Sequence, residues 1–160
     1  MWSWFTKATA NGKPKTLGQI GEELAQAEYK KRGLKIVAAN FFNKKGLRLG
    51  EIDFIASDKH TVIFVEVKTR ADNKGLFGTG AEAVDHFKQA KLLRAVKIFL
   101  QKRPEYQNFR PQIDVCLILI SDFSSLKSVQ TRPAKYLIAS GLDKIPHSVT
   151  IIPNAVEDWN

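Results

Sequence analysis

The stretch Gly50–Arg70, GEIDFIASDKHTVIFVEVKTR, decides the fold, because it reads as two apolar strands joined by a polar turn. Four charged residues interrupt its runs of Ile, Phe and Val: Glu51, Asp53, Glu66 and Lys68. A sheet core does not ordinarily hold charges unless they are paired or bind a ligand. The surroundings of these four residues must therefore explain why they are there.

Side chains alternate between the two faces of a strand, which predicts how these charges are arranged. In the second strand, Phe64, Glu66 and Lys68 are expected on one face, and Ile63, Val65 and Val67 on the opposite face, toward the core. By the same alternation, Glu51 and Asp53 share a face of the first strand. A hairpin register can then bring Asp53 beside Glu66 and Lys68 at one end of the sheet.

Two interpretations of these charges stay open. On a solvated face, Lys68 simply neutralises Glu66 and nothing further happens. Neighbouring carboxylates repel each other, however, whereas a hard divalent cation needs several oxygens in one place. Basic residues in and beside the loops at both ends of the hairpin favour the second interpretation, because they can hold a phosphate backbone: Lys44, Lys45, Arg48, Arg70 and Lys74.

Hydrophobic periodicity and turn residues predict the rest of the fold. Helices are expected over residues 17–33 and 81–102, and further strands over 34–42, 112–121, 135–140 and 148–153. Thr16 is the predicted N-cap of the first helix, and Gly33 is its predicted end. The long helix carries a row of basic residues spaced three apart, which is typical of a solvated edge: Lys88, Lys91, Arg94 and Lys97.

These elements predict an α/β fold. Its central sheet is mixed, contains a three-stranded antiparallel meander, and is flanked by helices. Residues 17–160 are expected to form one domain, because a chain of 160 residues with 44% hydrophobic and 26% charged residues suits a single core. Residues 1–16, which contain Gly12 and Pro14, are expected to be a flexible N-terminal extension.

The charge balance favours a polyanionic partner. Lys and Arg number 25 against 16 Asp and Glu, a formal net charge of +9. Nucleic acid is the first candidate, although ribosome-associated and membrane-surface proteins can be equally basic. The sequence contains no phosphate-binding P-loop and no Rossmann glycine pattern, which argues against a nucleotide cofactor.

Other features favour a cytoplasmic protein with no membrane partner. No apolar run reaches the roughly 18 residues that a membrane-spanning helix needs. Cys116 is the only cysteine, so no intramolecular disulfide can form, and a reducing compartment is expected. The three histidines do not fall at the spacing of a zinc site.

Asp53, followed after twelve residues by Glu66-Val67-Lys68, resembles the motif of the PD-(D/E)xK nuclease superfamily. More of the chain, from Gly18 to Val156, resembles the YraN-like family of predicted endonucleases, which is distantly similar to the archaeal Holliday-junction resolvases. The matching pieces occur in order along the chain: GQIGEELA, GEIDFIA, VIFVEVKTR, EAVDHFKQAKL, IDVCLI and IIPNAV. One departure is RPQID, where an aromatic residue is expected before Asp114.

The resemblance implies a restriction-endonuclease-like core for the α/β fold and a role for each matching residue. Asp53 and Glu66 would be ligands of Mg²⁺ or Mn²⁺, with the Val67 carbonyl as a further ligand and Glu22 completing the shell directly or through water. Lys68 would orient the attacking water and offset the developing negative charge. The implied catalytic set is thus Glu22, Asp53, Glu66 and Lys68. Glu51 also matches, in GEID, without a role that follows from the match.

The resulting hypothesis is a metal-dependent endonuclease that hydrolyses DNA phosphodiester bonds. Similarity to the resolvases implies branched or structured DNA as the substrate and a homodimer, because symmetrical cutting of a junction needs two active sites. The alternative is a non-catalytic nucleic-acid-binding or recruitment module with the same fold. A third hypothesis, a ribosome-associated basic protein, predicts RNA binding without metal dependence.

Overall fold

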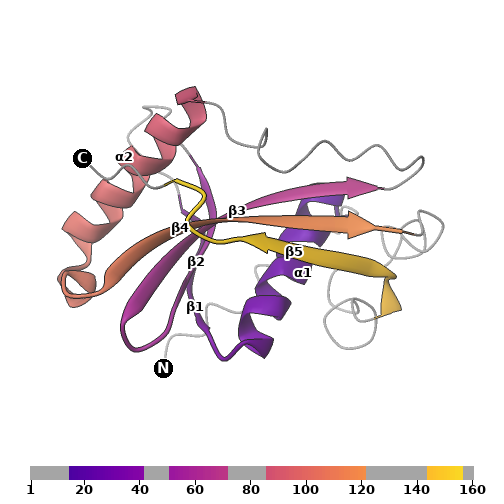
Figure 1. Cartoon of the computed structure of the whole chain (residues 1–160), viewed down its shortest axis with the longest axis horizontal. Helices are drawn as coiled ribbons and strands as arrows, with labels where there is room; N and C mark the ends of the chain where they lie inside the picture. The colour runs from indigo at the N-terminus through magenta and orange to yellow at the C-terminus, as the bar shows by residue number, and fades with distance from the viewer. Residues whose placement is uncertain (1–14, 42–50, 72–85, 122–143, 157–160) are drawn as a thin grey trace.

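The computed structural model describes residues 15–41, 51–71, 86–121 and 144–156 (Figure 1). The elements in chain order are α1 (Leu17–Lys31), β1 (Lys35–Phe41), β2 (Ile52–Ser57), β3 (Thr61–Ala71), α2 (His86–Lys102), η2 (Pro104–Tyr106), β4 (Arg110–Ile120) and β5 (His147–Ile152). The expected strand over 135–140, positions 81–85 of the expected long helix and most of the expected N-terminal extension lie outside the described residues. No helix of the described ranges is long and apolar enough to cross a membrane.

The five strands of the described residues form one mixed sheet in the order β1-β2-β3-β4-β5. The first three strands form an antiparallel meander, β4 runs parallel to β3, and β5 is antiparallel to β4. A parallel pair needs a crossover connection, and α2 lies in the segment that joins β3 to β4. This arrangement confirms the predicted α/β class and the meander, and it is compatible with a restriction-endonuclease-like core.

The ends of α1 follow the predicted signals. The Thr16 hydroxyl accepts a hydrogen bond from the Gln19 N–H at 3.2 Å, and the Gln19 side-chain oxygen accepts one from the Thr16 N–H at 2.9 Å. This reciprocal pair is a capping box. At the other end, Gly33 has a positive φ of 83°, which glycine adopts without steric cost. Both local predictions for α1 are confirmed.

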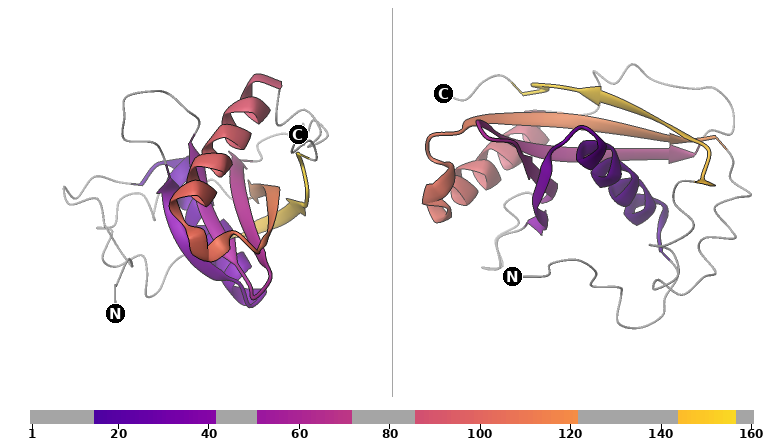
Figure 2. Two further views of the ribbon diagram at one scale, coloured as in Figure 1. Left: turned by 90° about the vertical axis from the view of Figure 1, so that its left-hand side faces the viewer. Right: turned by 90° about the horizontal axis from the view of Figure 1, so that it is seen from below.

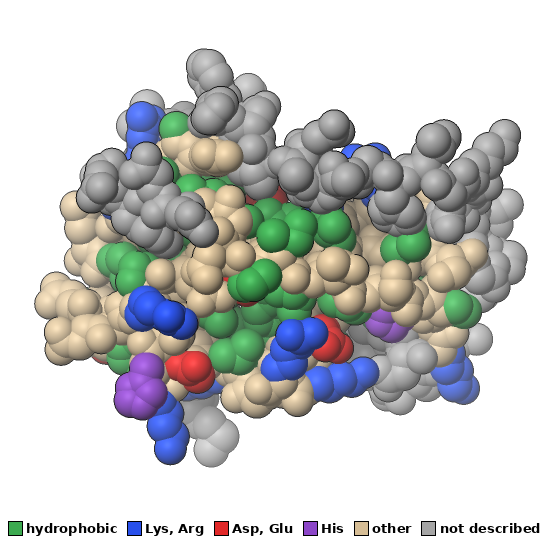
Figure 3. Space-filling model, viewed as in Figure 1, with side chains coloured by type: hydrophobic (Ala, Val, Ile, Leu, Met, Phe, Trp, Pro, Cys, Tyr) green, Lys and Arg blue, Asp and Glu red, His purple; other side chains and the backbone are tan. Residues whose placement is uncertain are grey.

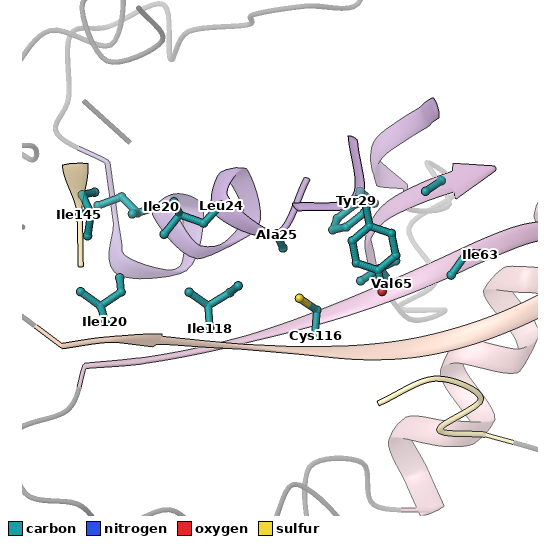
Figure 4. Packing of buried hydrophobic residues seen from close by; sticks show 12 residues of the cluster. Ile20, Leu24, Ala25, Tyr29, Ile63, Val65, Cys116, Ile118, Ile120 and Ile145 are labelled. Carbon is teal, nitrogen blue, oxygen red and sulfur yellow. The ribbon is translucent and has the colours of Figure 1, made fainter. Parts of the chain in front are cut away.

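The two helices cover opposite faces of the sheet. On one face, α1 residues Ile20, Leu24 and Tyr29 pack with Val65, Cys116 and Ile118 (Figure 4). On the other face, α2 residues Leu92, Val96 and Phe99 pack with Val62, Phe64 and Ile113. The successive β3 residues Phe64 and Val65 thus face different helices. Figure 2 shows the two helices toward opposite ends of the long strands β3 and β4.

The burial of both faces corrects one expectation. The sequence predicts that the Phe64 side of β3 lies away from the core, yet Phe64 is 1% exposed and its ring meets that of Phe99 edge-on, with ring centroids 5.4 Å apart. The alternation in β3 is as predicted, but the second face is also a core. A hydrophobic residue on each face of the same strand is typical of a sheet covered by helices on both sides.

Candidate active site

Strands β2 and β3 separate where the charged residues Asp53, Glu66 and Lys68 lie, and this place is called the fork below. Pairing between β2 and β3 ends with Phe54 opposite Val65, whereas β3 continues alongside β4 as far as Ala71. Immediately past that last pair, the Asp53 carboxylate accepts a hydrogen bond from the Val67 N–H at 2.7 Å. A side chain thus takes the place of a strand carbonyl as the acceptor, and it fixes Asp53 beside the Glu66-Val67-Lys68 segment, as the hairpin register predicted.

Glu66 is held by two lysines. Its Oε1 atom accepts a hydrogen bond from Lys68 Nζ at 2.8 Å, and Lys88 Nζ contacts the same oxygen. The Glu66 side chain is 6% exposed, whereas those of Lys68 and Lys88 are 29% and 38% exposed. A buried carboxylate needs such partners, because an unpaired charge in the protein interior is strongly unfavourable.

The contact of Lys88 overturns its predicted place on a solvated edge. The other members of that basic row, Lys91, Arg94 and Lys97, are exposed as expected. Lys88 differs because it lies in the first turn of α2, where the helix reaches the fork. Burial lowers the pKa of Lys88, but its contact with Glu66 and the nearby charge of Asp53 outweigh that effect and raise the pKa above its usual range.

A close helix–strand contact brings α1 to the same site. A β-carbon at Gly21 would lie 1.7 Å from Thr69 Oγ1, so only glycine allows α1 to approach β3 this closely. The next residue, Glu22, is half-buried. Burial, followed by the negative charges of Asp53, Glu51, Glu23 and Glu66, raises the pKa of Glu22 to about 7. Glu22 therefore lies within electrostatic range of the carboxylates of β2 and β3.

Asp53 is also partly buried close to other carboxylates. Burial and then the charge of Glu66 raise the pKa of Asp53 to about 6, against the opposing effect of the Val67 N–H. The exposed residue Glu51 adds a further repulsive charge. Carboxyl groups with raised pKa values that lie close together are typical of functional sites. A cation bound among them would relieve their mutual repulsion.

The donor chemistry of this cluster fits a hard divalent cation, but the ligands are not preassembled. Within the described ranges, no group of three or more His, Cys, Asp or Glu side chains is placed to hold a metal ion. The two lysines on Glu66 supply positive charge instead. The carboxylates of Asp53 and Glu66 supply the oxygen ligands that such a cation prefers, and a cation at Glu66 would take over part of the charge compensation that the lysines now provide.

The predicted DNA-binding residues are only partly described. Arg70 is exposed at the end of β3, two residues beyond Lys68. Lys44, Lys45, Arg48 and Lys74 lie outside the described residues. On the face seen in Figure 3, hydrophobic side chains gather at the centre and Lys and Arg side chains lie toward the margins.

Asp114 belongs to a separate, buried network. It is 2% exposed and accepts hydrogen bonds from Tyr29 Oη at 2.8 Å, Gln112 Nε2 at 2.7 Å and the Asn154 N–H at 3.3 Å. Burial and the Asp114 charge raise the pKa of Tyr29 well above its usual range, so its hydroxyl stays a donor. Asp114 lies within β4, and its hydrogen bonds from Tyr29 and Asn154 tie α1 to the turn after β5.

Gly21 and Lys88 are the site residues that the sequence interpretation missed. Gly21 lies in the quoted piece GQIGEELA, and a glycine inside a helix is a signal of close packing. Lys88 lies in EAVDHFKQAKL, where no pattern separates it from its exposed neighbours. Its role depends on how α2 meets β3, which is a tertiary contact.

Comparison with known proteins places the chain in a family. The model of the uncharacterised protein family UPF0102 matches residues 21–118, which include Glu22, Asp53, Glu66, Lys68 and Lys88. A UPF0102 protein of Caldanaerobacter subterraneus subsp. tengcongensis is 36% identical over 107 residues, covering 67% of this chain and 82% of the relative. One from Francisella tularensis subsp. tularensis is 40% identical over 97 residues (61% and 79%), and one from Clostridium botulinum is 34% identical over 116 residues (72% and 89%). The chain therefore belongs to the UPF0102 family.

Proposed function

We propose that this protein is a metal-dependent endonuclease that hydrolyses DNA phosphodiester bonds. The observation that carries the proposal is the fork between β2 and β3, where the Asp53 carboxylate is fixed on the Val67 N–H beside Glu66 and Lys68. The raised pKa values of Asp53 and Glu22 support it, because burial and then the charges of neighbouring carboxylates raise them, as is typical of carboxyl groups at functional sites.

Each residue at the fork would have a different role in the reaction. Asp53 and Glu66 would hold Mg²⁺ or Mn²⁺, with the Val67 carbonyl and Glu22 as further ligands. Such an ion, when bound, supplies an acidified water and charge relief at the phosphate. Lys68 stays within reach of Glu66, where its ammonium would orient the attacking water and offset charge on the phosphate. Arg70, exposed on the same strand, would contact a neighbouring phosphate.

DNA is the proposed partner because the chain carries a net charge of +9 and a phosphodiester suits a site of carboxylates and lysines. A preference for branched DNA, a homodimeric assembly and a cytoplasmic location remain predictions, as does the division into a short extension and one domain. They follow from the resolvase resemblance and from composition rather than from contacts at the fork.

Incubation with labelled linear, flapped, forked and four-way-junction DNA in Mg²⁺ and in Mn²⁺ tests the proposal. We expect cleavage that requires the metal and disappears in Asp53→Asn and Glu66→Gln. Glu105→Gln is the matched control, because Glu105 is exposed and pairs only with Arg103 among the described residues. Cleavage that persists in Asp53→Asn, or that proceeds in excess chelator, would contradict the proposal.

A non-catalytic nucleic-acid-binding module is the second candidate. The observation that favours it is the occupation of Glu66 by two lysines, which leaves the carboxylate cluster of the described residues without a preassembled metal cage. In that case the same DNA panel would give salt-sensitive binding with no cutting under any metal condition. Binding and cutting are separate readouts of one experiment, so the two candidates are distinguished directly.

A further inference from the structure

Lys68 and Lys88 reach Glu66 from different elements. Lys68 lies two residues along the same strand, so its proximity follows from the local geometry of β3. Lys88 comes from α2, which packs across the sheet on the Phe64 face. Both ammonium groups contact one oxygen, Oε1, of a single carboxylate. Two positive charges on one carboxylate oxygen indicate that the neighbouring carboxylates also contribute to holding them.

A divalent cation that binds Glu66 would lie close to the ammonium groups of Lys68 and Lys88. Like charges a few ångströms apart repel strongly when they are partly removed from water. A dication beside Oε1 would add to two ammonium groups already there, so at least one lysine must withdraw as the ion binds. Lys68 is anchored two residues from Glu66 on a strand paired with β4. Lys88 is the more exposed of the two, at 38% against 29%, and can withdraw into solvent.

We propose that Lys88 is a resident counter-ion of this site, whose ammonium occupies the place beside Glu66 Oε1 and competes with the divalent cation for that oxygen. The inference rests on the proposed function, because it takes Glu66 as a cation ligand. Lys88, held in place by α2, neutralises the Glu66 carboxylate until a cation displaces its ammonium group. The affinity of the site for the cation is therefore set partly by a residue that is not a ligand.

Calorimetric titration of the nucleic-acid-free protein with Mn²⁺ tests this competition. Lys88→Met removes the ammonium, and we expect Mn²⁺ to bind about tenfold more tightly than to the unmodified protein. Lys91→Met is the matched control, because it removes the same charge from an exposed position of the same helix. Its Kd for Mn²⁺ should stay within about twofold of the unmodified protein, which separates a local competitor from a change in net charge.

Lys88→Gln provides a second variant in case Lys88→Met does not fold. Glutamine retains a hydrogen-bond donor toward Glu66 without the charge, and circular dichroism verifies the fold of each variant. The same tightening is expected. An unchanged or weaker Mn²⁺ affinity in a folded Lys88 variant would overturn the inference and leave the proposed function standing. Failure of every variant and of the unmodified protein to bind Mn²⁺ would overturn both.

Discussion

Gly21 on α1 lies so close to Thr69 on β3 that a β-carbon at position 21 would fall 1.7 Å from Thr69 Oγ1 and 2.7 Å from Thr69 Cβ. No rotation of the Thr69 side chain removes the second contact, because Cβ is fixed by the backbone. The absence of a side chain at Gly21 thus sets how deeply α1 sits on the sheet. It also sets the distance from the next residue, Glu22, to Asp53 and Glu66.

Gly21→Ala should therefore destabilise the protein. The added methyl group must push α1 away from β3, and overpacking of this kind costs about 1–3 kcal/mol in the free energy of unfolding. Urea unfolding followed by circular dichroism measures the change. Gly18→Ala is the control on the same helix, because its β-carbon would meet only Thr16 Oγ1 at 3.9 Å. Alanine favours a helix, so Gly18→Ala should not destabilise; equal losses in both variants would contradict the close contact.

Asparagine and alanine at position 53 should separate folding from chemistry. Asp53→Asn keeps an oxygen that can accept the hydrogen bond from the Val67 N–H, so the stability should change by less than about 1 kcal/mol. Asp53→Ala leaves that N–H without its acceptor and should cost about 1–3 kcal/mol. Under the proposed function both variants lose cleavage. Denaturation and cleavage assays on the pair check this, and a stable Asp53→Ala protein would argue against the structural role of the bond.

The parts of this site that could be predicted are those that depend on local sequence. Alternation in β3 and the polar turn before it bring Asp53 to Glu66, and a two-residue spacing places Lys68 beside Glu66. The contacts of Gly21 and Lys88 depend on where two helices meet the sheet. Residue type and spacing do not encode that geometry, because the same glycine or lysine elsewhere on a helix would be exposed.

The hydrogen bond from Tyr29 to Asp114 should support the fold without taking part in catalysis. Tyr29→Phe removes one of three donors to a buried carboxylate, and we expect a loss of about 1.5–3 kcal/mol in unfolding free energy. Tyr106→Phe is the control, because its ring packs against Phe109 and phenylalanine preserves that contact. It should change the stability by less than about 0.5 kcal/mol. A folded Tyr29→Phe protein that loses cleavage would instead link Asp114 to the site.

The raised pKa values of Glu22 and Asp53 predict how stability depends on pH in the metal-free protein. The folded state holds protons on these groups up to about pH 7 and about pH 6, whereas ordinary carboxyl groups lose theirs near 4.5 and 3.8. The folded state therefore binds more protons than the unfolded state in this window, so stability falls as pH rises through it.

Glu22→Gln should flatten this dependence between about pH 4 and pH 7, because it removes the group with the higher folded-state pKa. We expect the variant to be more stable than the unmodified protein at pH 8 by on the order of 1 kcal/mol, because solvent screens part of the repulsion at the half-buried Glu22 carboxylate. Urea unfolding at a series of pH values measures it, with Glu105→Gln as the exposed control. A stability curve of unchanged slope in Glu22→Gln would show that Glu22 is not part of the carboxylate cluster.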